Sequence, residues 1–325
     1  MRVPVVPRIL AVAAVCAALP AAALAHPSSG IVVDGQGRVY FQDIAGDVIW
    51  KIDAQGKLTK FYDKVGGHFL ALDAEGSFAR ADLKGFKRVT AAGVKPALIV
   101  AEGGAPIAVN SDGNLYSGLR SLEGSKAGGA LTRISPDGKQ QPFAPDLKAT
   151  VEKLGISGLA TGPEGSLYLA CNNAVLKVRA DGTFTKVAEK VEVKDCDEDI
   201  PDDPTVRMPA LRGLAVDAKG TVYVAATGCH RVVKITADGK VETVLKSERP
   251  WSPTGVAVSG EDVYVLEYTH AHANADKGWR PRVRKLGRDG KVTTLATIPA
   301  KEPEGRAKSA GCGLFRGWSC RWPAR

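Results

Sequence analysis

Residues 213–239, "GLAVDAKGTVYVAATGCHRVVKITADG", contain two apolar runs separated by turn residues, and the same pattern occurs elsewhere in the chain. "GIVVDGQGRVYFQDIAGDVIWKIDAQG" from Gly30 and "GLATGPEGSLYLACNNAVLKVRADG" from Gly158 keep the first apolar run, the turn glycine and the second apolar run in step. Copies of this kind indicate a repeated supersecondary unit.

Each copy predicts a four-stranded antiparallel meander. The best copy contains the β-forming runs "GLAVD", "TVYVAA", "RVVKIT" and "VETVLK". Asp-x-x-Gly separates the first two runs at residues 34–37, 73–76 and 217–220, and "DAQG", "PDG" or "ADG" separates the last two. Glycine accepts the positive φ of such tight turns, which other residues resist.

Six copies are present, and they begin near Gly30, Phe69, Pro106, Gly158, Gly213 and Gly255. A four-stranded sheet with two apolar faces is not stable alone, whereas a radial arrangement lets the copies cover one another's faces. The sequence therefore predicts an all-β, six-bladed β-propeller over residues 26–300, with the first strand of each copy innermost. An open β-sandwich or two separate β domains is the alternative. We expect the sixth blade to pack on the first without strand exchange, because "KVTTLATI" forms an outer strand.

The two ends of the chain lie outside this pattern. Residues 1–25 combine two arginines, an apolar run and Ala-Leu-Ala, which predicts a signal peptide and a mature chain that starts at His26. Cys16 follows Val15, where lipid attachment requires a small residue, so a soluble exported protein is expected, periplasmic or extracellular. No other run approaches the roughly 18 apolar residues of a membrane span. Residues 301–325 break the repeat pattern and are predicted to form an irregular basic tail.

The net charge of +9 is concentrated at the ends. The leader carries two arginines and no acid, and the last 25 residues carry six basic and two acidic residues, which leaves +3 for the body. This distribution argues against a nucleic-acid-binding face. The expected partner is a small-molecule ligand or substrate, bound by a monomer without a membrane span.

The repeats carry a family resemblance. "CHRVVKITADG" after "GLAVDAKGTVYVA" resembles the NHL repeat, and "GRVYFQDIAGDVIWKIDAQGKLTKFY" is similar to the first blade of SMP-30/gluconolactonase-like and virginiamycin B lyase-like propellers. The resemblance covers residues 30–298. It implies the propeller architecture and only weakly implies an activity, because these families share blades and differ in function.

The long insertions fall on one predicted face. In a meander blade, the loops between the second and third strands and the links between blades share a face, which we call the loop face. The insertions "SGLRSLEGSKAGGALTR", "KVEVKDCDEDIPDDPTVRMPALR" and "EYTHAHANADKGWRPR" all belong to it. Loops on a rigid scaffold often carry function, so the loop face is the expected ligand face, with neutral drift as the alternative.

Five cysteines remain in the predicted mature chain. A disulfide is plausible in an exported protein, and Cys196 with Cys229 would tie the long link onto its own blade. Cys171 is a competing partner, and Cys312 with Cys320 is a separate candidate pair. The odd number leaves at least one thiol free.

The SMP-30/gluconolactonase resemblance implies a divalent cation at the channel mouth, held by Glu, Asn and Asp residues just before inner strands. This chain has Ser28 and Ser29, Ser157 and Arg212 at the corresponding positions. An arginine repels a divalent cation. The cofactor therefore remains undefined: a divalent metal is compatible with the family, but the usual ligand set is not matched.

Other polar residues are expected to meet at the mouth. The hypothesis assigns proton transfer to Glu267 and His270 and ligand binding to Arg212, which suits a carboxylate or a polarised carbonyl. Further candidate ligand-binding residues are His68, Asn172, Tyr268 and His272. The alternative for Arg212 is a channel-lining ion pair with a neighbour such as Glu267.

Three further metal hypotheses come from histidines and acidic residues. His270 and His272, two residues apart, fit a transition metal or a solvated loop. His26 fits an amino-terminal copper site, and "DCDEDIPDD" fits calcium or a solvated loop. Two functions follow from the sequence: an exported hydrolase of a lactone, ester or similar carbonyl compound, or a non-catalytic scaffold for a ligand, glycan or protein.

Overall fold

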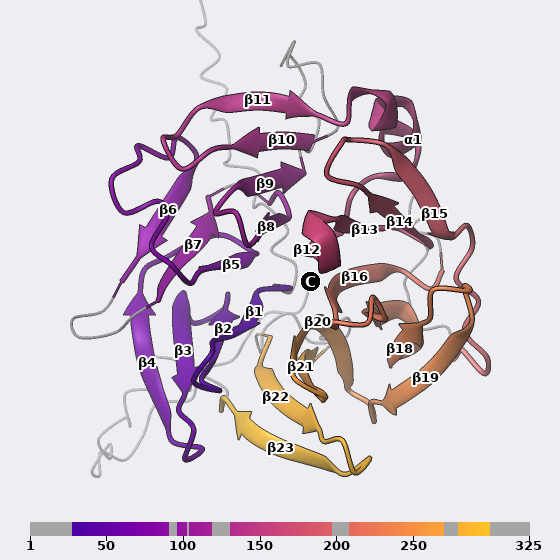
Figure 1. The fold of residues 1–325 in the computed structure, drawn as a ribbon. Coiled ribbons are helices and arrows are strands. Elements are labelled where there is room, and N and C mark those ends of the chain that lie inside the picture. Colours follow the sequence, from indigo (N-terminus) through magenta and orange to yellow (C-terminus); the bar gives the residue numbers. More distant parts are fainter. Residues whose placement is uncertain are drawn as a thin grey trace, which may run out of the picture.

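Six β-sheets are arranged around a central axis in the computed structural model (Figure 1). The structure describes residues 28–90, 96–102, 104–118, 131–196, 208–269 and 279–299. Five sheets are four-stranded antiparallel meanders, as the repeats predict. Each inner strand contacts the next around the ring, and the inner strand of blade 6 contacts that of blade 1. The predicted six-bladed propeller is confirmed.

The strands follow the chain blade by blade. Blade 1 contains β1 (Ile31–Val33), β2 (Val39–Asp43), β3 (Val48–Ile52) and β4 (Leu58–Asp63); blade 2 contains β5 (Leu70–Asp73), β6 (Phe86–Val89) and β7 (Ala97–Ala101); blade 3 contains β8 (Ile107–Val109), β9 (Leu115–Gly118), β10 (Leu131–Ile134) and β11 (Gln140–Phe143). Blade 4 contains β12 (Gly158–Thr161), β13 (Leu167–Cys171), β14 (Ala174–Val178) and β15 (Phe184–Ala188); blade 5 contains β16 (Leu211–Val216), β17 (Val222–Ala226), β18 (Arg231–Ile235) and β19 (Val241–Lys246); blade 6 contains β20 (Trp251–Ser259), β21 (Asp262–Thr269), β22 (Pro281–Leu286) and β23 (Val292–Thr297). The helix α1 (Lys148–Leu154) links blades 3 and 4.

The core is divided among the interfaces between blades. Six buried apolar clusters are present in the described residues, and each combines side chains from two neighbouring blades. Tyr40 and Ile49 of blade 1 pack on Leu70 and Leu98 of blade 2, for example. Each sheet thus buries both faces, which explains why the repeats are apolar on both sides of their strands.

The Asp-x-x-Gly segments form the tight turns that the sequence predicts. In the first, the N–H of Gly37 donates to the carbonyl of Asp34 at 2.9 Å, and Gly37 has a φ of 75°. The Asp34 carboxylate also accepts the N–H groups of Gln36 and Arg38 at 2.9 and 3.0 Å. Glycine is favoured at the last position because the left-handed backbone strains other residues.

Blade 2 differs from the predicted meander. Its described sheet has three strands, with β7 between β5 and β6, so the prediction of a fourth strand there is wrong. The segment after the Asp73 turn contains Arg80 and Asp82 and supplies no apolar run, although its Phe78 is buried against blade 3. All five residues of β7, "ALIVA", are buried. This apolar run takes the central position because a central strand has a neighbouring strand along each edge, whereas the outer strand β6 is only partly buried.

Blade 6 closes the ring on blade 1 without exchanging a strand, as expected. The Thr254 hydroxyl donates to the carbonyl of Ser28 at 2.6 Å, and the Tyr268 hydroxyl donates to the carbonyl of Gln42. The repeat glycines lie where predicted. Gly30 directly precedes β1, Gly158 opens β12, and Gly213 and Gly255 lie within β16 and β20, all of which are innermost strands.

Candidate functional site

The loop face is defined by the strand order. The three long insertions fall between β9 and β10, between β15 and β16, and between β21 and β22, as the sequence predicts. Residues 119–130, 197–207 and 270–278 of these insertions lie outside the described residues. They include His270, His272 and most of the acidic run. His26, Cys312 and Cys320, at the two ends of the chain, also lie outside the described residues. The candidate site is therefore described from the strand ends on the loop face and from those links between blades that the structure describes.

The inner-strand positions that correspond to metal ligands do not fit a metal ion. Ser28 is fully buried, and its hydroxyl donates to the carbonyl of His68 at 2.7 Å. The Ser157 hydroxyl donates to the carbonyl of Ala170 at 3.0 Å. The third position is the half-buried Arg212 in β16. Among the described residues, no group of three or more His, Cys, Asp or Glu side chains could hold a metal ion.

Glu267 occupies the interface between blades 5 and 6. It lies in β21 with no exposed surface. Its Oε1 accepts from Nη2 of Arg284 at 2.7 Å and from the Ser247 hydroxyl, and its Oε2 accepts from Nε of Arg282. A group that moves a proton must reach the ligand. In this placement Glu267 holds two arginines, and its described ion-pair partners are these arginines and not Arg212.

Tyr268 points to the other side of the same sheet. Successive strand residues face opposite sides, and Tyr268 is fully buried in the cluster between blades 6 and 1. Burial, assisted by the nearby negative charge of Asp43, raises the pKa of Tyr268 well above its usual range. The structure therefore does not bring Glu267 and Tyr268 together in one ligand pocket.

His68, Asn172 and Arg212 lie at the loop-face ends of blades 2, 4 and 5. His68 precedes β5, and its carbonyl accepts the N–H of Ser29 at 3.0 Å, which ties blade 2 to blade 1. Asn172 has a φ of 56° in the turn between β13 and β14, and its carbonyl accepts the N–H of Leu211 at 2.7 Å. These three side chains remain candidates for ligand contact on the loop face.

The sequence analysis missed an arginine cluster next to Glu267. Arg282 and Arg284 lie on one face of β22, and both are more than nine-tenths buried. The Arg282 guanidinium lies 4.3 Å from the centre of the Trp251 ring, and its Nη1 donates to Oε1 of Glu248 at 2.5 Å. The alternation in "RPRVRK" was the available signal, because two arginines two residues apart share one face of a strand.

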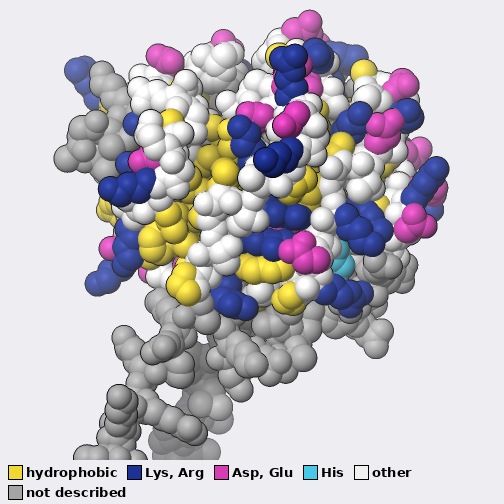
Figure 2. All heavy atoms as spheres, turned by 90° about the horizontal axis from the view of Figure 1, so that it is seen from below, with side chains coloured by type: hydrophobic (Ala, Val, Ile, Leu, Met, Phe, Trp, Pro, Cys, Tyr) yellow, Lys and Arg dark blue, Asp and Glu magenta, His cyan; other side chains and the backbone are white. Residues whose placement is uncertain are grey.

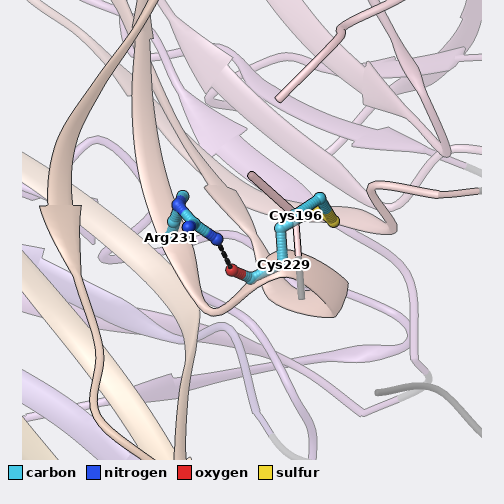
Figure 3. Close-up of a disulfide and its surroundings, with 3 residues drawn as sticks. All are labelled: Cys196, Cys229 and Arg231. Atoms are coloured by element: carbon cyan, nitrogen blue, oxygen red, sulfur yellow. Dashed lines mark hydrogen bonds between the residues drawn. A yellow bond between two sulfur atoms is a disulfide. The ribbon is translucent and has the colours of Figure 1, made fainter. Parts of the chain in front are cut away.

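The structure joins Cys196 to Cys229 with a Cα–Cα separation of 4.7 Å (Figure 3). This is the pairing that the sequence analysis preferred, and it fastens the link before blade 5 to the end of β17 through the turn at residues 227–229. Nη1 of the buried Arg231 donates to the carbonyl of Cys229 at 2.8 Å, which fixes the same turn from the other side.

Cys171 is the free cysteine among the described residues. Its side chain has no exposed surface, and burial raises the pKa of its thiol to about 12. Thiolates are the reactive form, so we expect Cys171 to resist iodoacetamide at pH 8 in the folded chain and to react after unfolding in guanidinium. Mass mapping of the Cys171 peptide measures this difference. Equal labelling of the folded and unfolded chains would contradict the buried position.

The chain belongs to the SMP-30/Gluconolactonase/LRE-like family, whose conserved region matches residues 27–272. Regucalcin, a calcium-binding protein from Agrobacterium tumefaciens, is 18% identical over 81% of this chain and 91% of its own, with a TM-score of 0.51. A gluconolactonase from Xanthomonas campestris is 15% identical over 74% and 83%, with a TM-score of 0.48. Virginiamycin B lyase from Staphylococcus aureus is 18% identical over 84% of each chain, with a TM-score of 0.47. At 18% identity, the match to regucalcin indicates a shared fold and nothing more.

The comparison with curated proteins gave no significant match. No helix among the described residues is long and apolar enough to cross a membrane. Figure 2 shows the molecule from the bottom of Figure 1, where basic and acidic side chains are interspersed over the surface. On this side the charge pattern is mixed, which gives no support to a nucleic-acid-binding face.

Proposed function

We propose that this member of the SMP-30/gluconolactonase family binds a small anionic molecule on its loop face and does not hydrolyse a lactone through a bound divalent metal. The observation that carries the proposal is the position of Arg212. It lies in the inner strand β16, at a site where the family resemblance implies a metal-binding carboxylate. A guanidinium favours a carboxylate ligand and disfavours a divalent cation.

The neighbouring groups support this reading. The hydroxyls of Ser28 and Ser157 are used in bonds to backbone carbonyls, and neither carries a negative charge. Glu267, the carboxylate that the sequence pointed to for proton transfer, is enclosed by two arginines. Arg212 therefore stands where the resemblance implies a metal-binding carboxylate, and the buried Glu267 is not accessible for acid–base chemistry on a ligand.

The second candidate function is hydrolysis of a lactone, ester or similar carbonyl compound. The family includes proteins named for gluconolactonase activity, and this favours the candidate. It would require His270 or His272, outside the described residues, to replace Glu267 as the proton-transfer group.

We also propose that the protein is exported and monomeric. The Cys196–Cys229 disulfide supports export, because disulfides persist in oxidising compartments.

A paired assay tests the proposed function. We expect no hydrolysis of glucono-lactone above the uncatalysed rate when the purified chain is supplied with Ca²⁺, Mn²⁺ or Zn²⁺ and acid release is followed with a pH indicator. We also expect gluconate, and not the neutral sugar glucose, to raise the melting temperature, since gluconate carries the carboxylate. Metal-dependent turnover that Arg212→Ala abolishes would favour the hydrolase instead. Equal effects of gluconate and glucose would exclude recognition of the charge.

A further inference from the structure

The arginine cluster between blades 5 and 6 has the geometry of a carboxylate-binding site. Glu267 bonds to Nε of Arg282 and to Nη2 of Arg284, and the Trp251 ring lies against the Arg282 guanidinium. Both arginines are therefore held in place before any ligand arrives. Arginines that are fixed in this way lose little conformational entropy on binding a carboxylate.

A loop carboxylate already occupies the outer side of this cluster. Glu248 lies in the link between β19 and β20, and its side chain is 62% exposed. Its Oε1 is 2.5 Å from Nη1 of Arg282, and its Oε2 is 3.6 Å from Nη1 of Arg284. One carboxylate thus spans two guanidiniums, and its hydrogen bond to Arg282 lowers the pKa of Glu248. Water surrounds most of this side chain, so little of the structure holds it there.

The cluster has more donors and more positive charge than its inner partners use. Nη2 of Arg282 and Nε of Arg284 are buried without a hydrogen-bond partner among the described residues. Buried donors are nearly always satisfied in proteins, so such orphans call for an explanation. When Glu248 turns away, two arginines face the single carboxylate of Glu267, and one positive charge lacks a partner.

We propose that Arg282 and Arg284 bind the carboxylate of a small molecule in the place that Glu248 occupies, so that Glu248 acts as an internal competitor. The proposal rests on the proposed function, since it assumes an anionic ligand. It places that ligand at the boundary of blades 5 and 6, where the strands β20 and β22 begin on the loop face. An internal competitor lowers the apparent affinity by the fraction of time that it occupies the site.

Glu248→Ala tests the competition in the full chain. Sodium gluconate is the probe, and titration calorimetry is the measurement. We expect Glu248→Ala to bind gluconate about fivefold to tenfold more tightly than the unchanged chain, because the competing carboxylate is gone. The matched control is Glu242→Ala, which removes a partly exposed carboxylate of β19 that pairs with Lys234 and Lys240. We expect the control to bind gluconate as the unchanged chain does.

A third variant tests whether the increase in gluconate affinity depends on Arg282. Arg282→Lys in the Glu248→Ala background keeps the positive charge but removes the planar fork, so we expect the gain in affinity to disappear. Circular dichroism checks that each variant is folded. Equal affinities of Glu248→Ala and Glu242→Ala, or a gain that survives Arg282→Lys, would overturn the site. If the unchanged chain still binds gluconate in that case, the proposed function stands and the ligand lies elsewhere; if no variant binds gluconate, both proposals fail.

Discussion

Glu267→Gln is expected to destabilise the folded chain by about 3–5 kcal/mol, the loss typical of breaking a buried ion pair. The change keeps the size of the side chain and removes the charge that Arg282 and Arg284 share. Both arginines remain more than nine-tenths buried, and Glu248 alone is then left to compensate them. Chemical denaturation followed by circular dichroism measures the loss.

The control is Glu242→Gln, which alters a partly exposed carboxylate that pairs with two lysines. Water reaches that side chain, so the denaturation midpoint of the Glu242→Gln chain should stay close to that of the unchanged chain. The double variant Glu267→Met with Arg284→Met should be less destabilised than the sum of its single changes, because the two charged groups compensate each other. A Glu267→Gln chain with an unchanged midpoint would show that the cluster does not stabilise the fold, and would reopen a functional role for Glu267.

The sequence predicted the architecture because the repeat unit is itself the structural unit. The apolar runs mark strands that are covered on both sides, and the turn glycines mark the hairpins. The repeat pattern mispredicted blade 2 because this blade keeps the turn motif but lacks an apolar run directly after it. The later apolar run "ALIVA" of β7 takes the place of that missing strand beside β5. Pairing between strands that are not adjacent in sequence leaves no local signal.

The candidate site was less predictable for a different reason. The strand period shows that Arg282 and Arg284 share a face, but it does not show which blade covers that face or which carboxylate meets them. Glu267 has the residue type and the position at a loop that suggest proton transfer. Its partners come from the neighbouring strand and from the link of blade 5, and only the tertiary structure shows that they enclose it.

Crowding at the channel gives the repeat glycines a role that the sequence did not reveal. A Cβ added to Gly158 would lie 2.4 Å from the carbonyl oxygen of Arg212, and one added to Gly213 would lie 2.8 Å from Cα of Gly255. Neither glycine has a positive φ, so backbone conformation is not the reason for glycine there. Neighbouring inner strands approach too closely for a side chain at these positions.

Gly255→Ala is therefore expected to lower the free energy of unfolding by about 3 kcal/mol, the upper end of the usual overpacking cost. The new Cβ would lie 2.5 Å from the carbonyl oxygen of Ser29 in blade 1. The Ser29 backbone cannot easily retreat, because its N–H donates to the carbonyl of His68 at 3.0 Å. The strain thus falls on the contact through which blade 6 closes the ring.

Gly35→Ala is the matched control, since a Cβ there meets nothing within 4 Å and the φ of Gly35 is not positive. Guanidinium denaturation should show a clear loss for Gly255→Ala and almost none for Gly35→Ala, and equal midpoints would mean that the first and sixth inner strands do not pack this closely.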